Sequence, residues 1–497
     1  MGIMNTLRLK NFRCLEDTGD IEIRPLTFLV GANSSGKSSF LKFFPLLRQS
    51  VRVRKKGVFL WNYHDVDLRD FRNTVREGAD NISVDFVLGS LPLRGRSHIS
   101  AGREVTGLRV SFEIEALEEH YDFMRRIKLH YQDQEIDIDF EPNGITSVFV
   151  NGKCMNELYP LESIIIASQG TGVIPGLWFN SEKDITSHPA YNFAAMRRIV
   201  QDHFSSAQMA AARIRNALNM VLFSKKELED YIKDEWSLKL KKIDIDSLNN
   251  LMLYQNVGYI LFSLNECISE YANSIEYIRP LRATIDRYYR FQNYAIDEIE
   301  SNGENLAMYL YNLMPSQKSR LDMWTLRMFG FKILVNAHEG HIELGISEGE
   351  NGIFHNLVDV GFGYTQLLPI IVLIWKAVYM GPVRGFGSRK TAKKIIVIEQ
   401  PELHLHPRMQ MLFADMLVKV LQTTEKGKFR FIIETHSETI INRVGELISL
   451  ENKFSQEDVN VVLFQKGEQG SSVTIASYDE DGYLTNWPVG FFSGYAD

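Results

Sequence analysis

The sequence predicts an α/β fold, in which a mixed β-sheet with flanking helices carries an inserted helical lobe. Three observations support this prediction. An apolar strand, a glycine-bounded loop and a helix follow one another over residues 26–50. A second strand–helix–strand order spans residues 394–433. Between them, residues 190–272 repeat apolar side chains at helical spacing, with few glycines or prolines.

The N-terminal elements are short strands. Residues 6–13 alternate apolar and polar side chains, as a half-buried strand does, and residues 21–23 and 26–30 continue the same sheet. From residue 82 to residue 150, short alternating runs are separated by turn signals such as Asn151-Gly152. This pattern predicts an antiparallel extension of the sheet.

A phosphate-binding loop follows the strand at residues 26–30. Residues 31–38 match G-x-x-x-x-G-K-[ST], and the strand before them is the context that such a loop requires. Lys37 has the length to reach the β- and γ-phosphates, the Ser38 hydroxyl can bind Mg²⁺, and a helix beginning near Ser39 adds the positive end of its dipole. The sequence therefore predicts a site for ATP and Mg²⁺, with the cofactor-binding residues Asn33, Ser34, Ser35, Gly36, Lys37, Ser38 and Ser39.

The middle of the chain predicts helices over residues 191–223 and 247–271. A sustained heptad pattern is absent from these segments, which argues against a long coiled-coil arm. After residue 277 the chain returns to mixed structure. A buried parallel strand is predicted at residues 394–398, a helix at 409–421 and a strand at 429–433. Residues 459–464 and 473–476 form a predicted closing hairpin.

Two polar positions follow the last buried strands. Glu399 ends the first of them, where a carboxylate can hold the Mg²⁺ of a phosphate loop. His436 follows the second and can sense the γ-phosphate. The alternative interpretations are a polar turn for Glu399 and a structural histidine for His436.

A glycine-bearing turn leads into an apolar helix at Asp359–Gln366. The free N–H groups of such a helix start can bind phosphate oxygens, and the alternative is an ordinary capped loop. The candidate nucleotide-binding residues here are Gly361, Gly363, Thr365 and Gln366.

Together these motifs resemble ATP-binding-cassette (ABC) ATPases of the chromosome-organising and recombination-repair type, over about residues 1–50 and 355–445. The resemblance implies an ABC-type head with the P-loop NTPase fold. It makes Asp359–Gln366 a signature segment that closes on ATP bound to a second protomer, in a homodimer or a higher homo-oligomer. The expected domains are an N-terminal ATPase lobe (1–180), a helical insertion lobe (181–275) and a C-terminal ATPase lobe (276–497).

A narrower similarity is to the ATPases of bacterial anti-phage systems, namely overcoming-lysogenization-defect proteins and the ATPase subunit of Septu systems, some of them encoded with retrons. It is carried by residues 33–39, 278–282, 399–407 and 434–437. It implies a subunit that controls a partner HNH-type nuclease, joined in retron versions by a reverse transcriptase with its DNA or RNA product. The alternative function is a DNA repair or recombination ATPase that acts directly on DNA.

One departure from the ABC pattern affects the mechanism. Most of these strands end in Asp-Glu, a metal ligand followed by a general base, whereas this chain has Glu399 and Gln400. A glutamine cannot take a proton from the attacking water, so ATP hydrolysis is expected to be slow unless Glu402 or another carboxylate substitutes. The catalytic candidates are accordingly Glu399, Gln400, Glu402 and His436, and Ser38 and Glu399 are the metal candidates.

Bulk properties exclude several other classes. The net charge of −7 argues against a nonspecific polyanion binder, although basic clusters occur near Arg52 and Arg94. The apolar run at residues 367–375 is too short to span a bilayer, and we expect a cytoplasmic protein without a membrane partner. About sixty residues follow His436, too few for a nuclease domain, and the D-x-D at Asp479–Asp481 is expected to lie in a turn.

Overall fold

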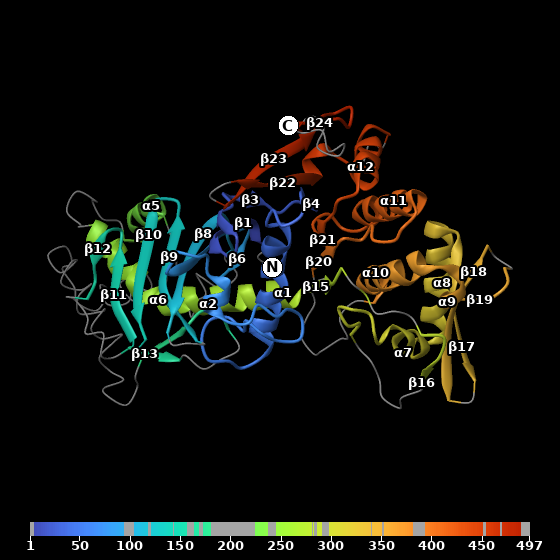
Figure 1. Ribbon diagram of the computed structural model, residues 1–497. Coiled ribbons are helices and arrows are strands. Elements are labelled where there is room, and N and C mark those ends of the chain that lie inside the picture. Colours follow the sequence, from blue (N-terminus) through green and yellow to red (C-terminus); the bar gives the residue numbers. More distant parts are fainter. Residues whose placement is uncertain are drawn as a thin grey trace. The chain divides into compact units, whose positions relative to one another are not determined.

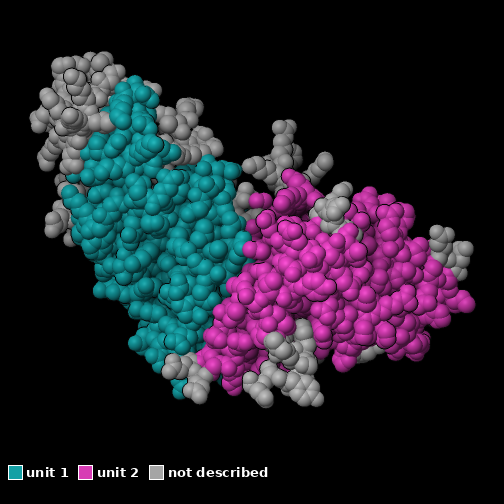
Figure 2. All heavy atoms as spheres, turned by 90° about the horizontal axis from the view of Figure 1, so that it is seen from above, with its two compact units in different colours: residues 1–22, 46–273 teal, residues 23–45, 274–497 magenta. Residues whose placement is uncertain are grey.

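The computed structural model describes residues 4–93, 104–117, 121–142, 144–156, 164–167, 172–179, 224–236, 245–280, 282, 286–290, 298–338, 340–349, 352–380, 393–450, 454–467 and 470–488. The chain forms two compact units (Figure 2). Unit 1 contains residues 1–22 and 46–273, and unit 2 contains residues 23–45 and 274–497.

Unit 1 is built on an antiparallel sheet (Figure 1) with the strand order β12-β11-β10-β9-β8-β5-β1-β2. The antiparallel extension predicted for residues 82–150 is thereby confirmed. The strands of unit 1 are β1 (Met4–Phe12), β2 (Leu15–Asp17), β3 (Ile21–Glu22), β5 (Asn81–Leu88), β6 (Leu91–Pro92), β7 (Glu104–Val105), β8 (Leu108–Ala116), β9 (Asp122–Tyr131), β10 (Gln134–Glu141), β11 (Gly144–Val150), β12 (Lys153–Cys154), β13 (Ile164–Ala167) and β14 (Gly176–Phe179).

The helices of unit 1 are α2 (Phe71–Thr74), α5 (Lys225–Trp236) and α6 (Ile245–Asn273). Helix α6 confirms the helix predicted at residues 247–271, and its side chains Leu251, Leu261 and Leu264 are buried. The helix predicted at residues 191–223 lies outside the described residues.

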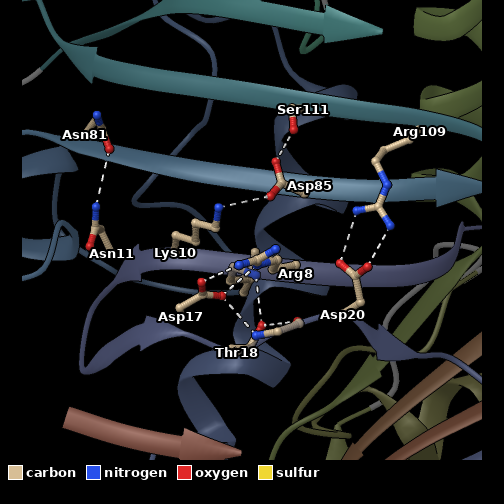
Figure 3. Close-up of polar contacts among 12 residues, drawn as sticks. Arg8, Lys10, Asn11, Asp17, Thr18, Asp20, Asn81, Asp85, Arg109 and Ser111 are labelled. Carbon is tan, nitrogen blue, oxygen red and sulfur yellow. Dashed lines mark hydrogen bonds and ion pairs between the residues drawn. The ribbon is translucent and has the colours of Figure 1, made fainter. Parts of the chain in front are cut away.

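One face of the unit 1 sheet carries ion pairs, several of them between neighbouring strands (Figure 3). Leu7 and Leu9 of β1 point into the core, so Arg8 and Lys10 project from the opposite face. Arg8 pairs with Asp17 at 2.5 Å, and Lys10 approaches Asp85 of β5 at 3.7 Å. On the same sheet Arg109 pairs with Asp20 at 2.6 Å, and Arg126 and Lys128 both pair with Asp137. We call this surface the paired-charge face.

Unit 2 is organised around a largely parallel sheet with the strand order β23-β22-β4-β21-β20-β15. Strands β15, β20, β21, β4 and β22 are parallel neighbours, and β22 and β23 form an antiparallel hairpin. This arrangement confirms the predicted β-α-β pattern and the closing hairpin. The main elements are β4 (Leu26–Gly31), β15 (Ile275–Ile278), β20 (Lys394–Glu399), α11 (Pro407–Thr423), β21 (Phe429–Glu434), α12 (Glu438–Leu450), β22 (Val459–Gly467) and β23 (Gly470–Tyr478).

A second, antiparallel sheet and several helices complete unit 2. Most side chains of helix α10 (Phe362–Tyr379) are apolar and belong to the core, where Trp375 is fully buried. Among the helices that the structure describes, α10 included, none is long and apolar enough to cross a bilayer. The remaining elements are β16 (Tyr289–Arg290), α7 (Leu306–Tyr311), α8 (Pro315–Phe329), β17 (Phe331–His338), β18 (His341–Glu348), β19 (His355–Asn356), α9 (Leu357–Val360), α10 (Phe362–Tyr379), the 3₁₀ helix η4 (Gln456–Asp458) and β24 (Leu484–Thr485).

The predicted fold class, an α/β fold with a mixed sheet and flanking helices, is confirmed by these strands and helices. One boundary differs from the prediction. Helix α1 (Lys37–Arg52) begins at Lys37 rather than near Ser39, because the Phe40 N–H already bonds the Gly36 carbonyl at 3.0 Å. The compact units also divide the chain differently from the three expected domains, since β4 pairs with β21 and β22 of unit 2. The expected domain limits stay predictions.

Candidate nucleotide and metal site

The loop between β4 and α1 has a backbone that only small residues permit. Gly31 has φ +152°, and a Cβ on it would lie 2.3 Å from the Phe464 carbonyl oxygen and 2.7 Å from the Ser35 Oγ. Gly36 and Ser34 also have positive φ values, of 104° and 61°. The fully buried strand β4 therefore ends in a tight turn, a geometry that can aim successive N–H groups at one anion.

Within this loop, Ser35 and Gly36 are buried, whereas Asn33 and Ser34 are exposed to solvent. The buried Ser39 follows in the first turn of α1. The Lys37 ammonium group bends back over the loop and donates to the carbonyl oxygens of Gly31 and Ala32, at 2.9 and 2.7 Å. Burial lowers the pKa of Lys37, and the carboxylates of Glu434 and Glu402 oppose that change.

The Ser38 hydroxyl points to a carboxylate that the sequence analysis did not single out. Its Oγ donates to the Glu434 Oε1 at 2.7 Å. Glu434 ends β21 in register with Glu399 of β20, so the two side chains project from the same side of the sheet. The signal was present in the sequence, because each glutamate directly follows an apolar strand run.

Glu434 is only 2% exposed, and its Oε2 is buried without a hydrogen-bond partner. Burial raises the pKa of Glu434 to about 7, with a further contribution from the nearby charge of Glu399. The bond from Ser38 opposes this increase.

Glu399 is held by groups from β15 and from the segment that follows it. The Tyr277 hydroxyl donates to the Glu399 Oε1 at 2.6 Å, and the Arg282 Nη2 donates to the Glu399 carbonyl oxygen at 2.9 Å. Burial raises the pKa of the Glu399 carboxyl, and the Tyr277 bond partly offsets this change. Burial also lowers the pKa of Arg282 to about 10, and the Nε and Nη1 atoms of this guanidinium have no hydrogen-bond partner.

Glu402 connects the loop after β20 to the loop after β21. Its Oε1 accepts the His436 N–H at 2.7 Å, and its Oε2 accepts the Thr435 hydroxyl at 2.8 Å. The pKa of His436 is lowered by burial and by the charge of Lys37. The preceding residue is held next to β4, because the Thr435 N–H bonds the Leu29 carbonyl oxygen at 3.1 Å. Gln400 has φ +43°, and its N–H bonds the Glu434 carbonyl oxygen at 2.8 Å.

The predicted signature segment lies at the start of α10. Gly361 is exposed and precedes the helix, and a Cβ on Gly363 would lie 2.8 Å from the His404 carbonyl oxygen. Thr365 and Gln366 are 4% and 2% exposed, and the Gln366 amide bonds the backbone N–H and carbonyl of Arg282, both at 3.4 Å. Thr365 and Gln366 therefore face their own unit, whereas Gly361 is open to solvent.

The D-x-D sequence lies in a turn, as predicted. The Asp479 Oδ1 accepts the N–H groups of Asp481 and Tyr483, at 3.1 and 2.8 Å, in the connection between β23 and β24. His406 has a structural role, because its Nδ1 accepts the Arg408 N–H at 3.2 Å and caps α11.

These residues fit a magnesium nucleotide. Ser35 Oγ and Glu434 Oε2 are buried polar atoms without partners, and the glycine turn leaves no room for larger residues. Hydroxyl and carboxylate oxygens are the ligands that Mg²⁺ prefers, and a phosphate would meet the lysine and the loop N–H groups. The arrangement therefore brings the glycine loop together with hydroxyl and carboxylate oxygens at the carboxyl ends of β4, β20 and β21.

Comparison with known proteins agrees with this chemistry. The family described as "AAA ATPase domain" matches residues 3–260 and 190–441. Among curated proteins, "Endonuclease GajA" of Bacillus cereus (strain HuB5-5) is 34% identical over 87 residues, which are 16% of this chain and 12% of that protein. The similarity to the endonuclease thus covers a small part of either protein.

Solved structures with similarity include the Smc head domain of Pyrococcus furiosus with an extended coiled coil bound to the C-terminal domain of ScpA. It is 12% identical with a TM-score of 0.36, covering 96% of this chain and 97% of that one. The SMC head domain from Thermotoga maritima is 10% identical with a TM-score of 0.35, covering 95% and 98%. The fold of this chain is defined by its own strand order.

Proposed function

Because this chain belongs to the AAA ATPase domain family, we propose that residues 31–39 bind ATP together with Mg²⁺. The observation that carries this proposal is the convergence of Lys37 and Ser38, at the end of β4, with the carboxylates of Glu399 and Glu434. When bound, the cation supplies positive charge between the phosphates and these carboxylates. The residues of the chain bind and orient: Lys37 neutralises phosphate charge, and Ser38 presents its oxygen to the metal.

We further propose an ABC-type arrangement, in which two copies dimerise around ATP. The exposed start of α10 at Gly361 supports this idea, since a helix start with free N–H groups is suited to phosphate oxygens of a neighbouring protomer. His436 follows β21, the strand that pairs with β4, and acts in this scheme as the sensor of the γ-phosphate.

Hydrolysis in this scheme is slow. Gln400 stands where a general base is expected and cannot accept a proton. Glu402, the nearest substitute in sequence, already uses both carboxylate oxygens to accept bonds from His436 and Thr435. We therefore propose that bound ATP persists and holds the assembly together.

The biological role that we propose is control of a partner nuclease in a bacterial anti-phage defence complex. Support comes from the motif strings at residues 33–39, 399–407 and 434–437, and from the 87-residue similarity to a protein named as an endonuclease. The proposed partner is an HNH-type nuclease. A reverse transcriptase with its nucleic-acid product is a further proposed partner. We propose that these partners dock on residues 181–275.

The test is the mass of the purified full chain, by light scattering, with and without ATP. Wild type is expected to double its mass when ATP and Mg²⁺ are added, and Lys37→Met is expected to remain monomeric because it lacks the phosphate-binding ammonium. A single copy under both conditions contradicts the dimer, and turnover of several ATP per second contradicts persistent binding. Co-purification with the products of neighbouring genes tests the nuclease partner.

A further inference from the structure

Two buried glutamates lie side by side at the ends of β20 and β21, but they have different partners. Glu399 and Glu434 are register neighbours and are 4% and 2% exposed. Glu399 accepts the Tyr277 hydroxyl, which comes from the opposite side of β20 to the phosphate loop. Glu434 accepts the hydroxyl of Ser38, the loop residue expected to bind the cation. Only one of the two carboxylates therefore has a described contact with the phosphate loop.

The second oxygen of Glu434 has no partner in the protein. Its Oε2 is buried and makes no hydrogen bond, which costs free energy for a carboxylate removed from water. Lys37 attracts the negative charge of Glu434, but its ammonium donates its described bonds to the carbonyl oxygens of Gly31 and Ala32. Glu399 and Glu402 repel that charge.

The site thus concentrates negative charge beside a serine hydroxyl that already has its proton directed to Glu434. With that proton engaged, the lone pairs of the Ser38 Oγ are free to bind a cation. Mg²⁺ is commonly held by one or two carboxylates together with phosphate oxygens. The unpartnered Glu434 Oε2 can supply such a carboxylate, the Ser38 Oγ adds a hydroxyl oxygen beside it, and the phosphate oxygens would come from the nucleotide.

We propose that Glu434, rather than Glu399, is the carboxylate that works with Ser38 to hold the phosphate-bound divalent cation. Its Oε1 orients the serine, and its Oε2 provides the negative charge that the cation meets. Glu399 instead fixes the end of β20 through Tyr277 and Arg282. This inference rests on the proposed nucleotide site.

A purely structural role for Glu434 makes a different prediction. Such a role needs only an acceptor for the Ser38 hydroxyl, and a glutamine supplies one through its amide oxygen. Glu434→Gln therefore keeps the shape and the acceptor but removes the charge. Glu399→Gln makes the same change at similar depth on the neighbouring strand, so it is the matched comparison.

The experiment measures the dissociation constant of a fluorescent, slowly hydrolysed ATP analogue for the full chain, once with Mg²⁺ and once with EDTA. The ratio of the two constants is the affinity gained from the cation. Glu434→Gln is expected to reduce this gain by about tenfold or more, the usual effect of removing a group that supports a metal. Its affinity in EDTA should be no weaker than that of wild type, because the substitution removes a charge that repels phosphate when no cation is present, and binding in EDTA also reports a folded loop. For Glu399→Gln, the reduction of this affinity gain is expected to be several-fold smaller than for Glu434→Gln.

An undiminished gain in Glu434→Gln overturns the inference, as does a loss in Glu399→Gln equal to or greater than that in Glu434→Gln. If Glu434→Gln does not fold, a Glu399→Gln variant that loses the cation-dependent gain by about tenfold still overturns it. Failure of the proposed function has a different signature, because wild type would then bind the analogue neither with Mg²⁺ nor with EDTA. That result removes the nucleotide site itself, and this inference with it.

Discussion

Replacing Tyr277 with phenylalanine tests how the end of β20 is stabilised. The hydroxyl of this 4% exposed tyrosine donates to the buried Glu399 carboxylate at 2.6 Å, and the substitution removes that bond while keeping the ring. A hydrogen bond to a charged group contributes about 1.5–3 kcal/mol. For a unit of 150–250 residues, each kcal/mol lowers the melting temperature by roughly 2–4 °C. We therefore expect a decrease of roughly 3–12 °C in unit 2 near pH 8.

The same substitution has a defined pH dependence. Burial already raises the pKa of Glu399, and the Tyr277 bond opposes this effect, so its removal raises the pKa further. A carboxyl whose folded pKa is raised destabilises the fold only where it is ionised. This penalty is absent when the pH is below the pKa of the carboxyl in the unfolded chain. It is complete when the pH is above the pKa of the carboxyl in the folded chain. The deficit of Tyr277→Phe should thus be small near pH 5 and should grow towards pH 8.

Tyr478→Phe provides the matched control for this measurement. Tyr478 is also 4% exposed, but its hydroxyl donates to a neutral acceptor, the Ile441 carbonyl oxygen, at 2.8 Å. Its loss should cost about 0.5–1.5 kcal/mol with little change between the two pH values. Scanning calorimetry of both variants and wild type at pH 5 and pH 8 gives the comparison. A Tyr277→Phe deficit that is constant with pH, or larger at pH 5, refutes the reasoning.

Two further substitutions test the loops around the site. Gly363→Ala places a Cβ 2.8 Å from the His404 carbonyl oxygen. We therefore expect the free energy of unfolding, measured in urea, to decrease by about 1–3 kcal/mol. An unchanged midpoint would contradict this expectation, because it would mean that the backbone moves away from the Cβ at no cost. Glu402→Ala removes the acceptor of the His436 N–H, so amide hydrogen exchange at residues 435–437 should accelerate by about tenfold or more, and unaltered protection would contradict this role.

The sequence predicted the secondary structure of the site better than its contacts. The apolar run before Glu399 and the glycine pattern at residues 31–38 are local signals, and both elements were found where expected. The contact between Ser38 and Glu434 joins residues 396 positions apart, and it depends on β21 lying next to β4. Strand order and register arise from packing of the whole sheet, so a glutamate after an apolar strand does not reveal which hydroxyl it will meet.

In the signature segment too, the sequence pattern predicted the helix but not the contacts of its side chains. Its glycines and its apolar helix were recognisable, but the inward orientation of Gln366 follows from the start of α10 at Phe362 and from the position of Arg282. Gln366 lies four positions after the first residue of the helix, which is about one full turn. The face of the helix on which it lies is therefore determined by the residue at which the helix begins. The first residue of a helix is among the features that a sequence pattern defines least sharply.

The paired-charge face of unit 1 has a consequence for how other molecules approach it. Each arginine drawn in Figure 3 has an aspartate within hydrogen-bonding distance, so opposite charges cancel within a few ångströms of the sheet. A nucleic-acid strand arriving from solution would meet a field that decays before it can capture or orient the strand. For the described strands β1, β5 and β8, association with a polyanion would therefore be neither accelerated by this surface nor strongly weakened by added salt.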